Sequence, residues 1–244
     1  MKKLCKETCK IQGISAKLCQ MKFKAVLFDI DGTLYDNKDV LWPGIPLILK
    51  HWPMLLSFRK VRHYLHQHVN AAIDAGMDFV SFQADLQARM RKKHESREKM
   101  LQWRARFIAD FDQIFNHVGP VPYVVDMLKF CQGKGVKMGL LSDFPLCKKI
   151  ERLGLSGYWN VRLSTEDCGA LKPSPRGFLD AARQIGEEPQ DILFVGNSYK
   201  YDVLGARGAG MRTAHYVKKK NPSSQADFQF NDYRQLKEKL EEWL

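Results

Sequence analysis

The second half of the chain shows a regular order of apolar and polar positions. From about residue 120 onward, stretches whose apolar residues recur every three or four positions alternate with short runs that are apolar throughout. The predicted helices occupy residues 122–135, 145–155, 175–186, 200–210 and 232–244, and the predicted strands occupy residues 136–142, 161–165, 191–196 and 212–217. Continuously apolar strands separated by helices indicate a parallel sheet covered on both faces. The pattern predicts an α/β fold, a doubly wound parallel sheet that binds ligands at the carboxyl ends of its strands.

Residues 36–118 break this order. They contain almost no strand pattern and long stretches of helical spacing. Two apolar stripes show this spacing: Phe79, Phe82, Leu86 and Met90, then Trp103, Phe107, Ile108, Phe111, Ile114 and Phe115. We predict a helical insertion over residues 36–118, flanked by a sheet domain formed by residues 21–35 and 119–244.

The composition is that of a globular protein able to bury a core and a smaller second domain. The chain has 244 residues, of which 45% are hydrophobic, and no apolar run approaches the ~20 residues needed to cross a bilayer. Its six cysteines follow no disulfide framework, and residues 1–20 lack the apolar stretch of a secretory signal. Cys5 and Cys9 have the spacing of a helical turn, but no His or Cys cluster nearby completes a metal site. We expect a reduced, cytoplasmic protein.

The net charge of +12 is concentrated in two segments. Residues 1–24 carry seven bases and one acid, and residues 50–110 carry twelve bases and six acids. A basic surface suits nucleic acid, an anionic membrane or an anionic small substrate, and it can also be a solvated face. Without an aromatic-studded basic strand or zinc spacing, we expect no specific nucleic-acid partner and no membrane partner, and either a monomer or a homodimer.

The first twenty residues stand apart from the rest. They show no amphipathic period, and Met21 precedes the first apolar run directly. We interpret residues 1–20 as a basic extension, either disordered or a misassigned start, and place the beginning of the folded domain near Met21.

The segment AVLFDIDGTL, residues 25–34, carries the chemistry. An apolar run ends in Asp29 and Asp31, and Gly32 then allows an immediate turn. Were the strand to continue, both carboxylates would share one face, and at ~4 Å they would repel by about 4 kcal/mol at an effective dielectric of 20. A divalent cation between them would explain the placement, whereas a solvated turn after an edge strand is the plainer alternative.

The pattern FDIDGTL resembles the first motif of the haloacid dehalogenase-like hydrolases, a superfamily composed mostly of magnesium-dependent phosphatases. The resemblance implies a Rossmann-like core, and it implies that the insertion over residues 36–118 is an α-helical cap over the active site. Ser142, at the end of a predicted strand, resembles the second motif, and Asp143 follows where the family often has Asn. Lys172, in ALKPSPRGF, resembles the third motif, in which Lys precedes Pro just before a helix.

The segment FVGNSYKYDVLGARGAGM, residues 194–211, resembles the last motif, a strand ending in Gly-Asp with a second acid four or five residues later. Asp202 matches the second acid. Asn197 stands where the first acid is usual, which removes one negative charge and lowers the expected affinity for Mg²⁺.

The resemblance implies a phosphomonoesterase that acts on a small phosphorylated metabolite. Asp29 would attack phosphorus and form an aspartyl-phosphate, already ionised if its pKa is near the reference ~3.9, and Asp31 would protonate the leaving oxygen and then activate water. The implied phosphate contacts come from Thr33, Ser142, Asp143 and Lys172. The implied Mg²⁺ ligands are Asp29, the backbone carbonyl of Asp31, Asp202 and, with its charge missing, Asn197.

Three other functions are compatible with the same fold. Dehalogenation is disfavoured because the superfamily's dehalogenases lack an acid at the position of Asp31. A sugar-phosphate mutase and a non-catalytic binding protein remain open, the second supported only by Asn197.

The insertion also contains a group of histidines, His63, His66 and His68. His63 and His66 lie one helical turn apart and could contact substrate or metal, but solvated surface positions are the simpler interpretation.

Overall fold

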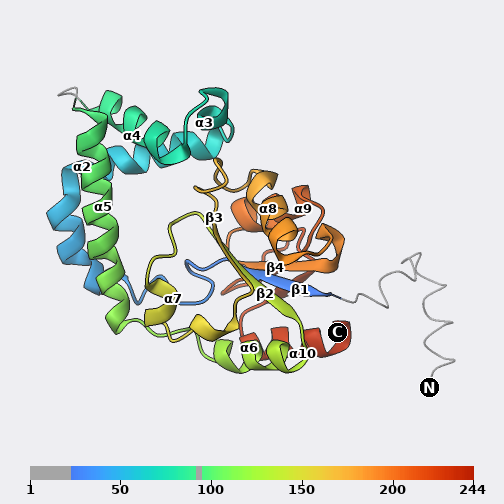
Figure 1. Ribbon diagram of the computed structural model, residues 1–244. Helices are drawn as coiled ribbons and strands as arrows, with labels where there is room; N and C mark the ends of the chain where they lie inside the picture. Colours follow the sequence, from blue (N-terminus) through green and yellow to red (C-terminus); the bar gives the residue numbers. More distant parts are fainter. Residues whose placement is uncertain (1–22, 92–94) are drawn as a thin grey trace, which may run out of the picture.

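The computed structural model describes residues 23–91 and 95–244 (Figure 1). Its core is a six-stranded sheet of order β3-β2-β1-β4-β5-β6 in which every neighbouring pair is parallel. The strands are β1 (Ala25–Phe28), β2 (Lys137–Ser142), β3 (Val161–Ser164), β4 (Ile192–Gly196), β5 (Arg212–Tyr216) and β6 (Phe228–Phe230). The predicted doubly wound α/β sheet is thus confirmed. The predicted extension over residues 1–20 lies outside the described residues.

Helices cover both faces of the sheet. One face carries α6 (Val124–Gly133) and α10 (Tyr233–Trp243), and the other carries α8 (Pro175–Ile185) and α9 (Leu204–Gly208) (Figure 1). The alternation of side chains along β1 divides the core between these faces. Val26 and Phe28 pack toward α6 and α10, whereas Ala25 and Leu27 pack toward α8.

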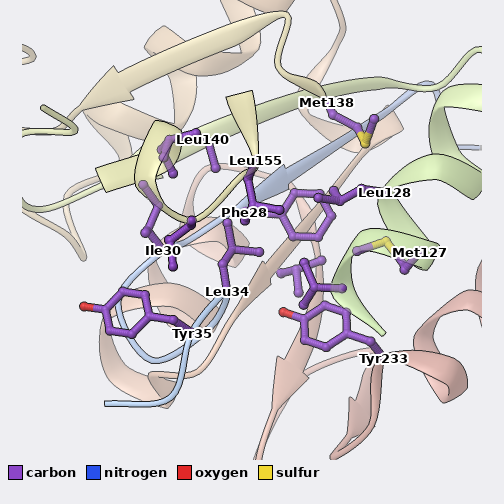
Figure 2. Close-up of a cluster of buried hydrophobic side chains, with 14 of the residues drawn as sticks. Phe28, Ile30, Leu34, Tyr35, Met127, Leu128, Met138, Leu140, Leu155 and Tyr233 are labelled. Carbon is purple, nitrogen blue, oxygen red and sulfur yellow. The ribbon is translucent and has the colours of Figure 1, made fainter. Parts of the chain in front are cut away.

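The apolar cluster on the face of the sheet that carries α6 and α10 supports the turn that follows β1. Figure 2 shows Phe28, Ile30 and Leu34 packed among side chains of β2, α6 and α10. Tyr233 of α10 is fully buried, and its hydroxyl donates to the backbone oxygen of Thr33 at 2.9 Å. The C-terminal helix therefore helps to fix the turn that holds the two aspartates.

The insertion between β1 and β2 forms helices. They are α2 (Leu41–Gln67), α3 (Ala71–Asp74), α4 (Phe79–Met90), α5 (Arg97–Ile114) and the short 3₁₀ turn η2 (Phe115–His117). Asp78 and Ser96 cap α4 and α5 by accepting backbone N–H groups of the first turn. In Figure 1 these helices form an arm beside the carboxyl ends of the strands. None of the helices in the described part of the chain is long and apolar enough to span a bilayer.

Two predicted helices differ from the observed ones. The helix expected over residues 145–155 is reduced to α7 (Lys149–Arg152), because Cys147 has a positive φ of 43° and Gly154 one of 70°. The helix expected over residues 200–210 begins as a π-helix, η5 (Tyr199–Val203), and continues as α9. Short 3₁₀ turns η3 (Ser156–Tyr158) and η4 (Pro189–Asp191) precede β3 and β4. The three-residue strand β6 was not predicted, since it is shorter than the periodicity can resolve.

Candidate active site

Side chains from four segments meet at the carboxyl ends of the central strands. Asp29 follows β1, Ser142 ends β2, Lys172 lies in the loop between β3 and α8, and Asp202 lies in η5 after β4. All four are buried, with exposed fractions of 5% or less. The parallel sheet brings them together because its strands all end at the same edge.

Lys172 is the centre of this group. Its Nζ donates to Asp29 Oδ1 at 2.6 Å and to Asp202 Oδ1 at 2.7 Å. The other oxygens of these carboxylates are also occupied, since Thr33 Oγ1 donates to Asp29 Oδ2 and the backbone N–H of Ser198 donates to Asp202 Oδ2. One ammonium thus joins two buried carboxylates that would otherwise repel each other.

The surroundings shift the pKa values of both partners. Burial raises the pKa of Asp29 to about 7, and the charge of Asp202 adds to this effect while Lys172 opposes it. For Lys172, burial would lower the pKa, but the charges of Asp202 and Asp29 outweigh it and hold the pKa above its ordinary value. A reference pKa of ~3.9 therefore does not describe Asp29 when only protein groups surround it.

Asp31 has a different lysine, which sequence reasoning missed. Lys149 of α7 donates to Asp31 Oδ1 at 2.5 Å, and the Tyr35 hydroxyl donates to the same oxygen at 2.6 Å. Ser142 Oγ donates to Asp31 Oδ2 at 3.3 Å. Burial alone would raise the pKa of Asp31, but the charge and hydrogen bond of Lys149 outweigh it and lower the pKa.

Lys149 is positioned by aromatic side chains. Its Nζ lies 5.9, 5.5 and 5.3 Å from the ring centroids of Tyr35, Phe111 and Phe115, within the range of cation–π attraction. These rings come from the turn after β1 and from the end of α5 and η2. Nothing in the sequence distinguishes Lys149 from its neighbour Lys148, so only this packing could have identified it.

The turn at Gly32 has no room for a side chain. Its φ is 81°, and a Cβ there would lie 2.3 Å from Asn197 Nδ2 and 2.6 Å from Asn37 Nδ2. The amide of Asn197 therefore lies directly against the turn between the two aspartates and Thr33. Its backbone oxygen accepts from His215 Nε2 at 3.1 Å, with the ring tautomer assigned accordingly.

Asp143, included among the predicted phosphate contacts, faces the protein. Its Oδ1 accepts from Thr165 Oγ1 at 2.7 Å and from the backbone N–H of Lys172 at 3.0 Å. Its backbone oxygen accepts from Arg62 of α2 at 2.8 Å. In this arrangement Asp143 positions the loop that carries Lys172.

The inserted helices contact this edge of the sheet through a buried ion cluster. Arg62 NH1 lies 2.5 Å from Glu166 Oε1, and Arg104 of α5 pairs with the other oxygen of Glu166. Glu166, in the loop after β3, is 4% exposed, and burial raises its pKa against the two arginines. Sequence reasoning missed all three residues, because each has an ordinary context and they meet only in the fold.

The three histidines of α2 and its end do not form a group. His66 Nδ1 donates to the backbone oxygen of Lys172 at 2.7 Å, and the ring stacks on Tyr201 at 4.3 Å between centroids. His63 instead contacts Gln67, and His68 stacks on Tyr64. Only His66 reaches the candidate site, whereas the other two are exposed as expected.

The donor set at the site suits Mg²⁺. Asp29 and Asp202 direct carboxylate oxygens at one point, where both contact the positively charged Lys172 ammonium. Within residues 23–91 and 95–244 no three His, Cys, Asp or Glu side chains are grouped as a metal site. Two carboxylates completed by backbone or amide oxygens and by waters are a set that Mg²⁺ accepts.

Comparison with known proteins agrees with this geometry. A sequence profile described as haloacid dehalogenase-like hydrolase matches residues 23–210. The chain belongs to the haloacid dehalogenase-like hydrolases. Its membership confirms the resemblance inferred from the motifs at Asp29, Ser142, Lys172 and Asp202.

Curated relatives of this hydrolase are similar at low identity. It is 25% identical over 237 residues to a glyceraldehyde 3-phosphate phosphatase of Methanopyrus kandleri, covering 87% of this chain and 95% of the relative. It is 26% identical over 198 residues to a phosphoglycolate phosphatase of Escherichia coli O157:H7, covering 77% and 78%.

Solved structures share the fold of the hydrolase. A 2-haloacid dehalogenase from Pseudomonas syringae pv. Tomato DC3000 superposes with a TM-score of 0.65 at 24% identity, covering 91% of this chain and all of that one. A HAD phosphatase from Thermococcus onnurineus gives a TM-score of 0.60 at 21% identity, covering 91% and 99%.

Proposed function

We propose that this hydrolase is a Mg²⁺-dependent phosphomonoesterase that acts on a small phosphorylated metabolite through an aspartyl-phosphate on Asp29. The observation that carries the proposal is the contact of Lys172 with both Asp29 and Asp202 at 2.6 and 2.7 Å. A carboxylate that attacks a phosphate dianion meets electrostatic repulsion, and a fixed cation beside it offsets that repulsion.

Asp29, Asp202, the backbone carbonyl of Asp31 and the amide of Asn197 would hold the Mg²⁺. When bound, Mg²⁺ supplies positive charge that favours the ionised form of Asp29 and stabilises the charge of the transferring phosphoryl group. The Lys172 ammonium would share this task, and Ser142 would donate its hydroxyl to a phosphoryl oxygen. Thr33, which donates to Asp29 Oδ2 at 2.9 Å, would hold the attacking carboxylate in a fixed orientation.

Asp31 would exchange protons with the leaving oxygen and with water. Its Oδ1 already accepts two hydrogen bonds, from Lys149 and Tyr35, whereas its Oδ2 accepts one long bond from Ser142. Oδ2 is therefore the oxygen suited to proton transfer. The Asp31 side chain is 27% exposed, so it lies at the side of the site that substrate and water can reach.

The inserted helices would serve as the cap over this site. Arg62 and His66 of α2 contact the loops that carry Asp143 and Lys172, and Asp29 keeps only 5% of its surface exposed beneath them. Because the site around Asp29 is enclosed, it favours a small phosphate ester over a bulky one. The curated relatives named for glyceraldehyde 3-phosphate and phosphoglycolate have substrates of this class.

The test is release of inorganic phosphate from a panel of small phosphorylated metabolites that includes both of these compounds. We expect release with Mg²⁺ and loss of release after chelation, restored when Mg²⁺ is added back. Asp36→Asn is the matched control, because the Asp36 side chain is 36% exposed in the segment after β1 and contacts Lys218 and the backbone N–H of Lys38, not the residues assigned to the site. Failure to release phosphate from any compound, or equal rates after chelation, would contradict the proposal.

A further inference from the structure

The outer face of α2 exposes an unusual amount of apolar surface. Among the described residues, seven of the twelve large apolar side chains that are more than a third exposed lie between residues 41 and 56. They form the α2 stripe: Leu41, Trp42, Ile45, Ile48, Leu49, Trp52 and Leu56. Trp42 is 81% exposed, Leu49 72% and Trp52 52%. Monomeric proteins rarely expose contiguous apolar patches above roughly 300–600 Å², and one tryptophan alone presents about 200 Å².

The stripe follows the helical period and is separate from the face that holds the fold together. Its members recur at three- and four-residue intervals, whereas Leu47, His51 and Phe58 point to the opposite side and are buried. Among the described residues, none of these seven belongs to an apolar cluster of the core, so in that part of the chain the helix has one packed face and one uncovered face.

We infer that the α2 stripe is a dimer interface, in which α2 packs antiparallel against α2 of a second copy across a two-fold axis near Leu49. Seven exposed apolar side chains, two of them tryptophans, can supply a large part of the ~800 Å² per partner that a standard interface buries. In a two-fold contact the same surface is used by both copies, so the stripe of each copy covers the stripe of the other.

Shape supports this orientation. A two-fold axis at Leu49 places Trp42 of one copy opposite Leu56 of the other. Leu56 borders a hollow of about 450 Å³, lined by Trp52, Pro53, Leu56, Ser57, Lys60, Met90 and Arg91, between α2 and the end of α4. The most exposed side chain of the stripe thus meets a concave part of it.

Charge supports it as well. The same axis brings Asp39, just before α2, opposite Arg59 of the other copy. Asp36 and Lys50 are already paired with Lys218 and Asp110, whereas the described residues offer Asp39 and Arg59 no ion-pair partner. The same axis also brings Lys38 opposite Lys60, but a parallel arrangement would set each of these four charges against its own copy, so the ends of the stripe favour the antiparallel one.

Other occupants fit less well. Residues 1–22 carry six bases and one acid, and α2 carries four bases and no acid, so the two segments repel. A helix that lies on an anionic membrane carries bases along its polar flanks. Between Leu41 and Leu56 the only base of α2 is Lys50, whose Nζ is 2.7 Å from Asp110.

The experiment is the molar mass of the full chain by light scattering across a concentration series. We expect a dimer for the natural protein and a monomer for Leu49→Asp, with dimerisation weakened so that Kd rises at least about a hundredfold, the scale of ~3 kcal/mol at a central interface residue. Leu179→Asp is the matched control, since Leu179 is 40% exposed on α8 and should leave the dimer intact. Circular dichroism and melting curves check that both variants are folded.

A charge exchange tests the orientation. Asp39→Arg or Arg59→Asp alone should weaken dimerisation, and the two together should restore it. A monomeric natural protein, or a Leu49→Asp variant that stays dimeric, overturns the interface. Failure of the double variant to recover overturns the antiparallel arrangement, and binding of the natural protein to phosphatidylserine vesicles in place of dimerisation assigns the stripe to a membrane.

Discussion

The two aspartates after β1 lie two residues apart but have opposite surroundings. Asp29 shares Lys172 with Asp202, deep at the strand ends, and burial raises its pKa. Asp31 forms an ion pair with a different lysine, Lys149. Its side chain is 27% exposed, and its pKa is lowered. The difference separates two tasks: one carboxylate is fixed at a buried cation, and the other lies beside its own lysine where water can reach it.

The contrast between Asp29 and Asp31 requires Asp29 to be the nucleophile. Asp29→Asn should lower phosphate release by at least about a thousandfold, because loss of a nucleophile removes the covalent route. It should also abolish the covalent phosphate detected on the chain by rapid-quench mass spectrometry. The melting temperature should be retained, since Asn keeps the shape and the contact with Thr33. Activity within tenfold of the natural protein would exclude this role.

The next largest effect is expected on the free energy of unfolding when Lys172 or Lys149 is replaced. Lys172→Met leaves Asp29 and Asp202 buried without their common partner, and breaking such a pair typically costs about 3–5 kcal/mol. Lys149→Met leaves only Asp31, which water can reach, so the loss in the free energy of unfolding should be clearly smaller. Urea unfolding of both variants at neutral pH measures the difference. Equal losses would mean that the two carboxylates are equally desolvated.

Leaving groups distinguish the chemical role of Asp31. Asp31→Asn should depress turnover of alkyl phosphates, whose leaving oxygen needs a proton, far more than turnover of p-nitrophenyl phosphate. Steady-state kcat for a series of esters, graded by leaving-group pKa, tests this. Equal losses across the series would limit Asp31 to shaping the metal site.

Asn197 should have a milder effect, on metal affinity. It lies against Gly32 and brings no negative charge to the site, so we expect activity to saturate only at millimolar Mg²⁺. Asn197→Asp should shift the activation curve to lower Mg²⁺ concentration. Superimposable curves for the two proteins would show that residue 197 does not face the metal.

The smallest effect concerns pH and His66. Burial lowers its pKa, with Arg62 and Lys172 contributing, although Asp143 and the bond to the Lys172 backbone oppose this. The unfolded chain therefore takes up the proton first, and stability falls as pH drops through the ordinary His pKa of ~6.5. His66→Gln should flatten the fall of melting temperature between pH 7.5 and 5.5 slightly. A steeper fall in the variant would contradict the sign.

The sequence predicted the surroundings of Asp29 but not those of Asp31. Asp29, Ser142, Lys172 and Asp202 were predictable because each follows a predicted strand, and parallel strands end at one edge. Lys149 was not, because its position depends on the positive φ of Cys147 and on aromatic rings contributed by the insertion.

The same limit explains the rest of the site. Glu166 meets Arg62 and Arg104 only after the insertion folds back, and periodicity carries no information on that docking. The π-helix at Asp202 was not predicted, because the spacing of apolar residues cannot distinguish a π-helical turn from an α-helical turn that is one residue shorter. The predicted cap boundaries, residues 36 and 118, stay a prediction, as do the roles of the site residues.

The order of strands in the sheet also bears on synthesis and folding. β1 pairs with β2 and β4, so Ala25 meets Lys137 on one side and Ile192 on the other. During synthesis, the strand that precedes both aspartates gains its second neighbour only when the second half of the protein has been made, and such distant pairings slow folding. Premature chain termination between β2 and β4 would thus yield a fragment with a half-paired, apolar central strand, a species suited to chaperone capture and degradation.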